Sequence, residues 1–222
     1  MKFINNKRLV GLIIILLLIN YSGLIFNLWY LQVAGIILTL LLAFLLVDLY
    51  INAKDQNKFI MDIWLLAIIS EIPYDLMTKG NINLTSQNMF FTWGVALLII
   101  KLMEVVSKLK VSKIDKWLFQ ILFIIMGAGV AYFLNFENHV MGVILLVGYY
   151  LVKNKKSLVI IPTGIAIIIA VLANDIIQLF MILGLLFLPF YKEEKLLKHD
   201  ALIIYFSYPI VLLIFAIIKY LI

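Results

Sequence analysis

The sequence predicts an all-α integral membrane protein, a polytopic bundle of about nine transmembrane helices with the N-terminus inside and the C-terminus outside. The 222 residues are 65% hydrophobic and only 14% charged, whereas a soluble domain is about half apolar and about a quarter charged. Apolar runs of membrane length recur along the whole chain, and basic residues gather in alternate connections between them. We therefore expect residues 1–222 to form a single transmembrane domain.

Nine apolar segments account for almost the entire chain. They are Leu9–Phe26, Leu31–Tyr50, Phe59–Leu76, Met89–Val106, Trp117–Leu134, His139–Val152, Leu158–Ala173, Ile176–Tyr191 and Ala201–Leu221. The first is too long for the apolar region of a signal peptide and leads directly into the second, so it is interpreted as a span. The sixth to eighth are shorter than the roughly 20 residues of a straight span, which leaves tilted or re-entrant helices open.

The basic residues indicate the orientation. Fifteen of the 18 lie in the N-terminal leader and in the alternate connections that this orientation places in the cytoplasm. Lys79 and Lys219 fall on the opposite side, and Lys101 lies within a span. By the positive-inside rule, this pattern predicts a multi-pass protein of the bacterial cytoplasmic membrane. The net charge of +6 is thus explained by topology, and no nucleic-acid partner is expected.

Few kinds of reactive site are available. The chain has no cysteine, which excludes disulfides, thiolate metal sites and cysteine nucleophiles. It has only two histidines, His139 and His199, so no histidine metal site is predicted.

The stretch Ser70-Glu71-Ile72-Pro73-Tyr74-Asp75 carries the strongest functional signal. It ends the third apolar run, where a carboxylate costs roughly 3 kcal/mol on insertion scales. Glu71 and Asp75 are four residues apart and share one helix face if the helix continues through Pro73. Pro73 could alternatively be a simple kink whose freed carbonyl is satisfied by Ser70 or by a neighbouring helix.

Several other polar residues approach the same outer face in this topology. The hypothesis is an outward-opening polar pocket lined by Asn20, Tyr21, Glu71, Asp75, Glu137 and His139. The alternative is that Glu137 and His139 are solvated residues of a short outer loop. The acids near other span ends are interpreted as side chains that reach the membrane interface; they are Asp48, Asp62, Glu104 and Asp175.

Four stretches resemble the TraX family of membrane proteins. The run KFIMDIWLLAIISEIPYDL, which begins at Lys58, is similar to a family stretch that ends in S-[EQ]-I-P-F-D. NMFFTWGVALLI from Asn88 resembles the family's N-[VL]-F-F-T segment. ENHVMGVILLVGYYL from Glu137 is similar to its acid-x-x-x-x-G-V-L-L segment, and YFSYP from Tyr205 to its closing F-Y-x-x-Y-P.

The resemblance implies a membrane acyltransferase that acetylates the N-terminal amine of a conjugative pilin. Acetyl-CoA would be the donor, and a peptide or pilin-like amine the acceptor. On this hypothesis Glu71 is the candidate base, and Asp75, Glu137 and His139 orient the amine. Candidate substrate-binding residues are Asn20, Tyr21, Ser70 and Tyr208.

The sequence also departs from the family pattern. Asn20-Tyr21 stand where family members carry an Asp-His pair, Ile36 and Asp62 align with expected arginines, and Val211 aligns with an expected histidine. The alternative is therefore a catalytically silent accessory or immunity subunit that binds a peptide or a partner membrane protein and needs no cofactor. A small-molecule transporter is a third reading, without the paired broken helices typical of that class.

Overall fold

The computed structural model describes residues 6–191 and 198–221, and this part of the chain is built from helices. The α-helices are α1 (Asn6–Ile25), α2 (Trp29–Asn52), α3 (Gln56–Thr78), α4 (Met89–Ser107), α5 (Lys113–Phe133), α6 (His139–Leu151), α7 (Ile160–Leu172), α8 (Met181–Leu185) and α9 (Lys198–Leu221). Short 3₁₀ turns are η1 (Lys156–Val159), η2 (Ile176–Phe180) and η3 (Leu188–Phe190). The prediction of an all-helical chain is confirmed.

Eight of the nine predicted segments each correspond to one α-helix. The eighth does not form a continuous helix. Its residues form η2, the five-residue α8 and η3, with Gly184 inside α8 and Pro189 inside η3. Proline cannot donate to the carbonyl group one turn earlier, and Pro189 therefore fits the end of the regular helix α8 at Leu185.

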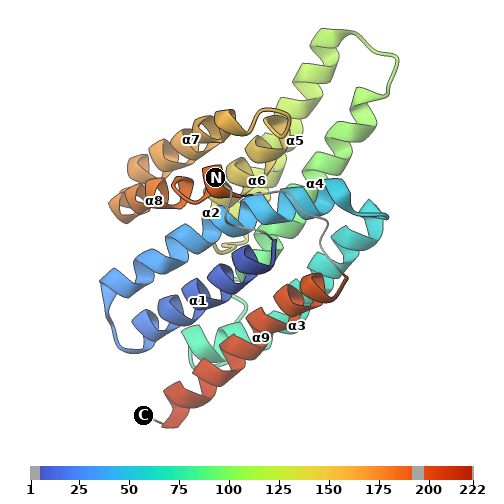
Figure 1. Ribbon diagram of the computed structural model, residues 1–222. Coiled ribbons are helices and arrows are strands. Elements are labelled where there is room, and N and C mark those ends of the chain that lie inside the picture. The colour runs from blue at the N-terminus through green and yellow to red at the C-terminus, as the bar shows by residue number, and fades with distance from the viewer. Residues whose placement is uncertain (1–5, 192–197, 222) are drawn as a thin grey trace.

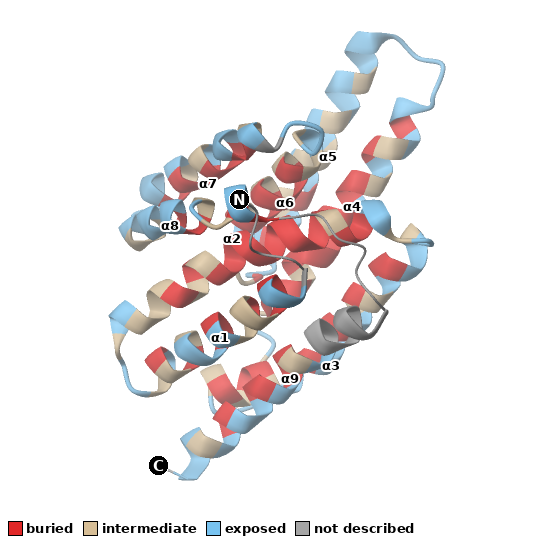
Figure 2. Ribbon diagram, viewed as in Figure 1, coloured by how far each residue is buried: buried red, intermediate tan, exposed pale blue. Residues whose placement is uncertain are grey.

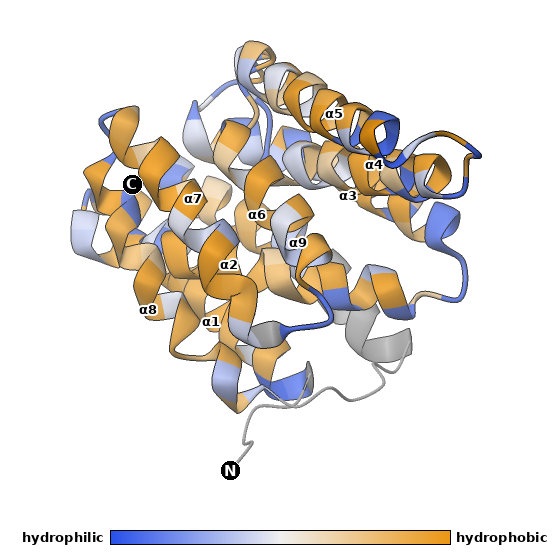
Figure 3. Cartoon of the chain, turned by 90° about the horizontal axis from the view of Figure 1, so that it is seen from above, coloured by the Kyte–Doolittle hydropathy of each residue, from blue (hydrophilic) through white to orange (hydrophobic). Residues whose placement is uncertain are grey.

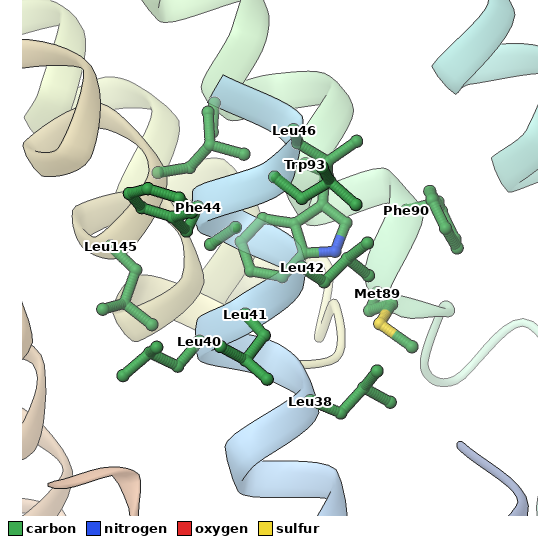
Figure 4. Packing of buried hydrophobic residues seen from close by; sticks show 14 of the residues in the cluster. Leu38, Leu40, Leu41, Leu42, Phe44, Leu46, Met89, Phe90, Trp93 and Leu145 are labelled. Atoms are coloured by element: carbon green, nitrogen blue, oxygen red, sulfur yellow. The ribbon is translucent and has the colours of Figure 1, made fainter. Parts of the chain in front are cut away.

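Helix α2 lies at the centre of the bundle (Figure 1) and packs against α1, α6 and α8. Its middle is buried on all sides (Figure 2), as expected for a helix that is apolar around its whole circumference. Leu40, Leu41 and Leu45 of α2 are fully buried. Figure 4 shows Trp93 of α4 and Leu145 of α6 beside the leucines of α2.

The remaining helices surround this core. Helix α3 packs against α9 and α4, and α4 packs against α5 and α6. In Figure 1 the α4–α5 hairpin projects from one side of the bundle, so residues 108–112 lie at the opposite end of α4 from Met89. The 19 residues of α4 separate its two ends by about 28 Å.

The outer surface is apolar along the helices. Four helices of the described residues, α1, α2, α4 and α5, are long and apolar enough to cross a membrane. Figure 3 shows hydrophobic residues along the helices and many of the hydrophilic ones at helix ends and connections. Most of α5 is exposed, including Ile114, Ile121 and Ile125. Such exposed apolar faces are those of a helix in contact with lipid, so the fold is compatible with a membrane protein.

Local sequence explains where several helices begin. Asp55 accepts hydrogen bonds from the backbone N–H groups of Asn57 and Lys58 and so caps α3. Ser112 caps α5 by accepting from Asp115 N at 3.1 Å. Both are N-cap residue types that satisfy otherwise unbonded donors. Helix α3 continues through Pro73, as the shared face of Glu71 and Asp75 requires.

Candidate functional site

The four stretches that carry the family resemblance meet at the N-terminus of α4. Asn88 is the N-cap of that helix, and its Oδ1 accepts from Phe90 N at 3.0 Å. Its Nδ2 donates to Ala67 O of α3 at 2.8 Å and to Glu71 Oε2 at 2.7 Å. The backbone N–H of Asn88 also donates to Glu71 Oε2, at 3.1 Å. Glu71 and the fully buried Asn88 therefore fasten α3 to the start of α4.

Glu137 reaches the same helix end from the α5–α6 connection. Its Oε2 accepts from Met89 N at 3.1 Å, and its own backbone N–H donates to Gln87 O at 2.8 Å. Thr92 Oγ1 donates to the carbonyl oxygen of Glu137. Asn135 Nδ2 donates to Thr85 O at 2.9 Å, which ties the two connections together. Residues 134–138 thus hold Glu137 in one position beside α4.

Two carboxyl groups consequently share one helix N-terminus. The first N–H groups of a helix lack intrahelical partners and carry the positive end of its dipole, which favours nearby negative charge. Burial raises the pKa of Glu137 to about 7, an effect that the N–H of Met89 opposes and the negative charge of Glu71 increases. A carboxyl group with this pKa can accept and release a proton near neutral pH.

Glu137 lies in the wall of a cavity of about 520 Å³ at this end of the bundle. The walls come from α1, α2, α4, α5, α7, η2 and the start of α6. Asn20 and His139 line it together with Glu137, as predicted, and Asp175 adds a second carboxyl group. Gly35 allows Asn20 to approach α2, because a Cβ atom at Gly35 would overlap the Asn20 amide. The cavity therefore combines an apolar wall with acidic and amide groups, and none of its lining residues in the described part of the chain is Lys or Arg.

The other predicted residues lie beside this cavity without lining it. The Tyr21 and Tyr208 hydroxyls are 3.4 Å apart in the buried interior, and the Tyr208 ring packs edge-on against Phe90 with centroids 4.8 Å apart. Ser70 is fully buried, and its hydroxyl has no hydrogen-bond partner among the described residues. It therefore does not satisfy the carbonyl freed by Pro73.

Asp75 has a different environment from Glu71 although both lie on α3. Its carboxylate is fully buried, with Oδ1 at 2.7 Å from Lys79 Nζ and Oδ2 accepting from Asn83 N at 2.8 Å. Lys79 Nζ also donates to Asn83 O at 2.6 Å and to Ser86 O at 2.7 Å. This pair fixes the α3–α4 connection. The single pocket expected from the sequence is thus divided, since neither Asp75 nor Glu71 lines the cavity.

At the opposite end of α4, Glu104 is partly exposed and joins neighbouring helices. Its carboxylate accepts from the hydroxyls of Tyr50 at 3.0 Å and Tyr150 at 2.8 Å, and it lies 3.9 Å from Lys101 Nζ. That Glu104 reaches the membrane interface stays a prediction.

Sequence reasoning assigned Asn138 no place in the site, and it included Asn88 and Thr92 only within the stretch that resembles the family. Asn88 directly precedes an apolar run, which is the signature of an N-cap and fits the predicted start of that segment at Met89. Asn138 has positive φ (66°), and its Oδ1 accepts from Thr39 Oγ1 at 3.3 Å. Its place in the cavity wall depends on the packing of α6 against α2, for which the local sequence gives no signal.

A family model described as TraX protein matches residues 6–219, nearly the whole chain. No curated protein and no solved structure matches it. The residues that carry the motifs, Glu71, Asn88, Glu137 and Tyr208, are those that gather around the α4 N-terminus. The chain belongs to the TraX family.

Proposed function

We propose that this chain is a multi-pass protein of the bacterial cytoplasmic membrane that binds the amine of a peptide or pilin-like acceptor in its outer cavity and prepares that amine for acetylation. About nine spans with a cytoplasmic N-terminus would place the cavity at the outer face. The apolar helices and the distribution of lysines support this orientation. Residues 1–222 would form one transmembrane domain.

The observation that carries the proposal is the position of Glu137. Glu137 lines the cavity, and its carboxyl group accepts from Met89 N and has its pKa raised by burial to about 7. An amine arrives as an ammonium ion, which is not a nucleophile until it loses a proton. The carboxylate of Glu137 would attract the ammonium and accept that proton, leaving the nitrogen lone pair available for attack on an acyl carbon.

The roles of the neighbouring residues follow from their contacts. Glu71 holds Asn88 and, through Asn88, the start of α4, so Glu71 acts as a positioning residue. The role of base, which the sequence suggested for Glu71, is assigned to Glu137 instead. His139 and Asn20 line the cavity and would orient the acceptor. Tyr21, Ser70 and Tyr208 support the helices behind it, and Asp75 fixes the α3–α4 connection.

The acyl donor is a separate matter. The family resemblance implies acetyl-CoA, whose phosphates are bound by cationic groups. Among residues 6–191 and 198–221, no Lys or Arg lines the outer cavity, so this wall does not fit the nucleotide part of that donor. The basic α4–α5 hairpin lies about 28 Å away at the other end of α4. The outer cavity is therefore assigned to the acceptor, and its residues are given no step that involves the donor.

The composition of the cavity wall favours a second candidate function. This is a silent accessory or immunity subunit that binds a peptide or a partner membrane protein without acetyl transfer. The cavity retains the acidic and amide groups that bind an amine, while its wall, as far as the structure describes the chain, contains no Lys or Arg.

Acetyl transfer by protein purified in lipid tests both candidates. Acetyl-CoA and a pool of short peptides with free N-termini would be supplied to wild type, Glu137→Gln, Glu71→Gln and Asp175→Asn. We expect Glu137→Gln to abolish transfer. Glu71→Gln should lower the rate and shift its pH profile toward lower pH, because loss of the Glu71 charge removes one cause of the raised pKa of Glu137. Asp175→Asn is the matched control, because it removes a carboxylate from the same cavity. Peptide binding without transfer would establish the silent subunit, and transfer unaffected by Glu137→Gln would refute the base assignment.

A further inference from the structure

The tip of the α4–α5 hairpin, residues 107–117, carries positive charge that no residue of the chain is seen to neutralise. The hairpin projects from the bundle, so its tip stands clear of the other helices (Figure 1). Three exposed lysines follow one another closely there, Lys108, Lys110 and Lys113. Within the described part of the chain, salt bridges join Lys79 to Asp75 and Lys101 to Glu104, and none involves these three lysines.

The acid of the hairpin tip and its fourth lysine are already engaged. Ser112 Oγ donates to Asp115 Oδ2 at 2.7 Å and accepts from Asp115 N at 3.1 Å, so Asp115 is held at the N-terminus of α5. Lys116 Nζ donates to Ser107 O at 2.7 Å and links the two helices across the turn. These bonds fix the shape of the hairpin tip and leave the charges of the other three lysines to an external anion.

Exposed apolar side chains alternate with these lysines along the hairpin tip. They are Leu109, Val111, Ile114 and Trp117, with exposed fractions from 40% to 72%. Nearer the bundle, the outer surface of both helices is apolar, as at Val105 of α4 and Ile121 of α5. Tryptophan is enriched where a spanning helix leaves the hydrocarbon, and lysines follow it in the headgroup region. The order of residues thus indicates that the hairpin tip lies at the level of the lipid headgroups.

These features restrict the partner. Helices α4 and α5 are both long and apolar enough to cross a membrane, and a turn between two such spans lies at a membrane surface. A soluble acidic protein or a nucleic acid would match the charges but would leave the apolar residues in water, whereas a layer of anionic headgroups above hydrocarbon matches both. We propose that the hairpin tip binds anionic phospholipids through its three unpaired lysines and inserts Leu109 and Ile114 into the adjoining hydrocarbon. In the proposed orientation these lipids belong to the cytoplasmic leaflet.

Native mass spectrometry of the purified full chain tests the choice of lipid. Phosphatidylglycerol or phosphatidylcholine with identical acyl chains would be titrated into the detergent-solubilised protein, and we expect wild type to prefer phosphatidylglycerol. Lys110→Gln should weaken phosphatidylglycerol binding about fivefold, and replacing all three lysines of the hairpin tip by Gln should abolish the preference. The matched control removes the same net charge from three exposed lysines outside the hairpin, Lys54→Gln, Lys58→Gln and Lys155→Gln. Loss of the preference in this control as well would overturn the proposal, since net charge alone would then explain it.

Insertion is tested separately, because the chain has no cysteine and Ile114→Cys provides a single site for a nitroxide label. In nanodiscs of phosphatidylglycerol, this label should be accessible to oxygen and shielded from a water-soluble nickel reagent. A label at Asn57→Cys, an exposed residue at the start of α3, is the control that the nickel reagent should reach.

Three results would overturn the proposal at this stage. Equal nickel accessibility of the two labels would show that Ile114 stays in water. Soluble glycerophosphoglycerol that competes as well as the intact lipid would show a site for free anions, to which the apolar residues contribute nothing. Polyglutamate that displaces phosphatidylglycerol from wild type would assign the hairpin tip to a soluble acidic partner.

Discussion

Replacing Asn88 with alanine is expected to release the start of α4 from α3. The Asn88 side chain caps α4 through Phe90 N and donates to Ala67 O and to Glu71 Oε2. Loss of an N-cap costs about 1 kcal/mol. Loss of the amide leaves a buried carboxylate oxygen with fewer donors, which costs about 2 kcal/mol more. We expect Asn88→Ala to lower the free energy of unfolding by about 3 kcal/mol.

The measurement is unfolding of the purified protein in mixed micelles, followed by tryptophan fluorescence. Ser112→Ala is the control, because Ser112 caps α5 at an exposed position and should cost only about 1 kcal/mol. Asn88→Ser keeps a capping oxygen and removes the amide, so its loss should lie between the two. A double-mutant cycle with Glu71→Gln should give a coupling of about 1 kcal/mol. A loss in Asn88→Ala no larger than that in Ser112→Ala would refute this account of the junction.

Three further predictions concern the same end of the bundle. Asp75→Ala should destabilise the protein by about 4 kcal/mol in the same unfolding assay, because it leaves Lys79 half-buried without its partner, whereas Asp75→Leu with Lys79→Met should recover much of the loss. Gly142→Ala should cost about 2 kcal/mol because a Cβ there meets packed atoms, while Gly129→Ala, with open space around it, should be neutral. The pKa of Glu137 is raised to about 7 in the folded protein from an ordinary value of 4.5, so the folded state binds the proton more tightly. Stability should therefore fall as pH rises from 4.5 to 7, and thermal unfolding of Glu137→Gln should lose this dependence.

The positions of the helices were predictable from the sequence because membrane-length apolar runs leave little choice of structure. The ends agree closely, as for Met89–Val106 against α4 at Met89–Ser107. The eighth segment was the exception. Its hydrophobicity indicated one regular helix, but Pro189 ends the regular α-helical turns at Leu185, and 3₁₀ turns make up most of the rest.

The division of the candidate site could not be predicted in the same way. Residues four apart on a helix share a face, so Glu71 and Asp75 were expected in one pocket. Lys79 lies a further turn along α3 and binds Asp75, whereas Glu71 meets Asn88 from α4. Which neighbour each carboxylate meets depends on the course of the α3–α4 connection, and no periodic pattern encodes that course. Topology placed Glu137 in an outward-opening pocket, but only the packing of α2, α4, α6 and α7 shows which residues line the cavity with it.

The two lysines that depart from the positive-inside pattern have a common structural role. Lys79 binds the connection that follows α3, and Lys219 of α9 donates to Met77 O at 2.8 Å and Thr78 O at 3.1 Å. The last carbonyl groups of a helix lack partners and carry the negative end of its dipole, so cations stabilise that end. Both lysines thus fix the C-terminal end of α3, and the connection held there leads directly to Asn88. Their positive charges stabilise the α3–α4 connection and hence the start of α4, beside which Glu137 lies. This explains why the two lysines lie at the end of the bundle that is otherwise poor in basic residues.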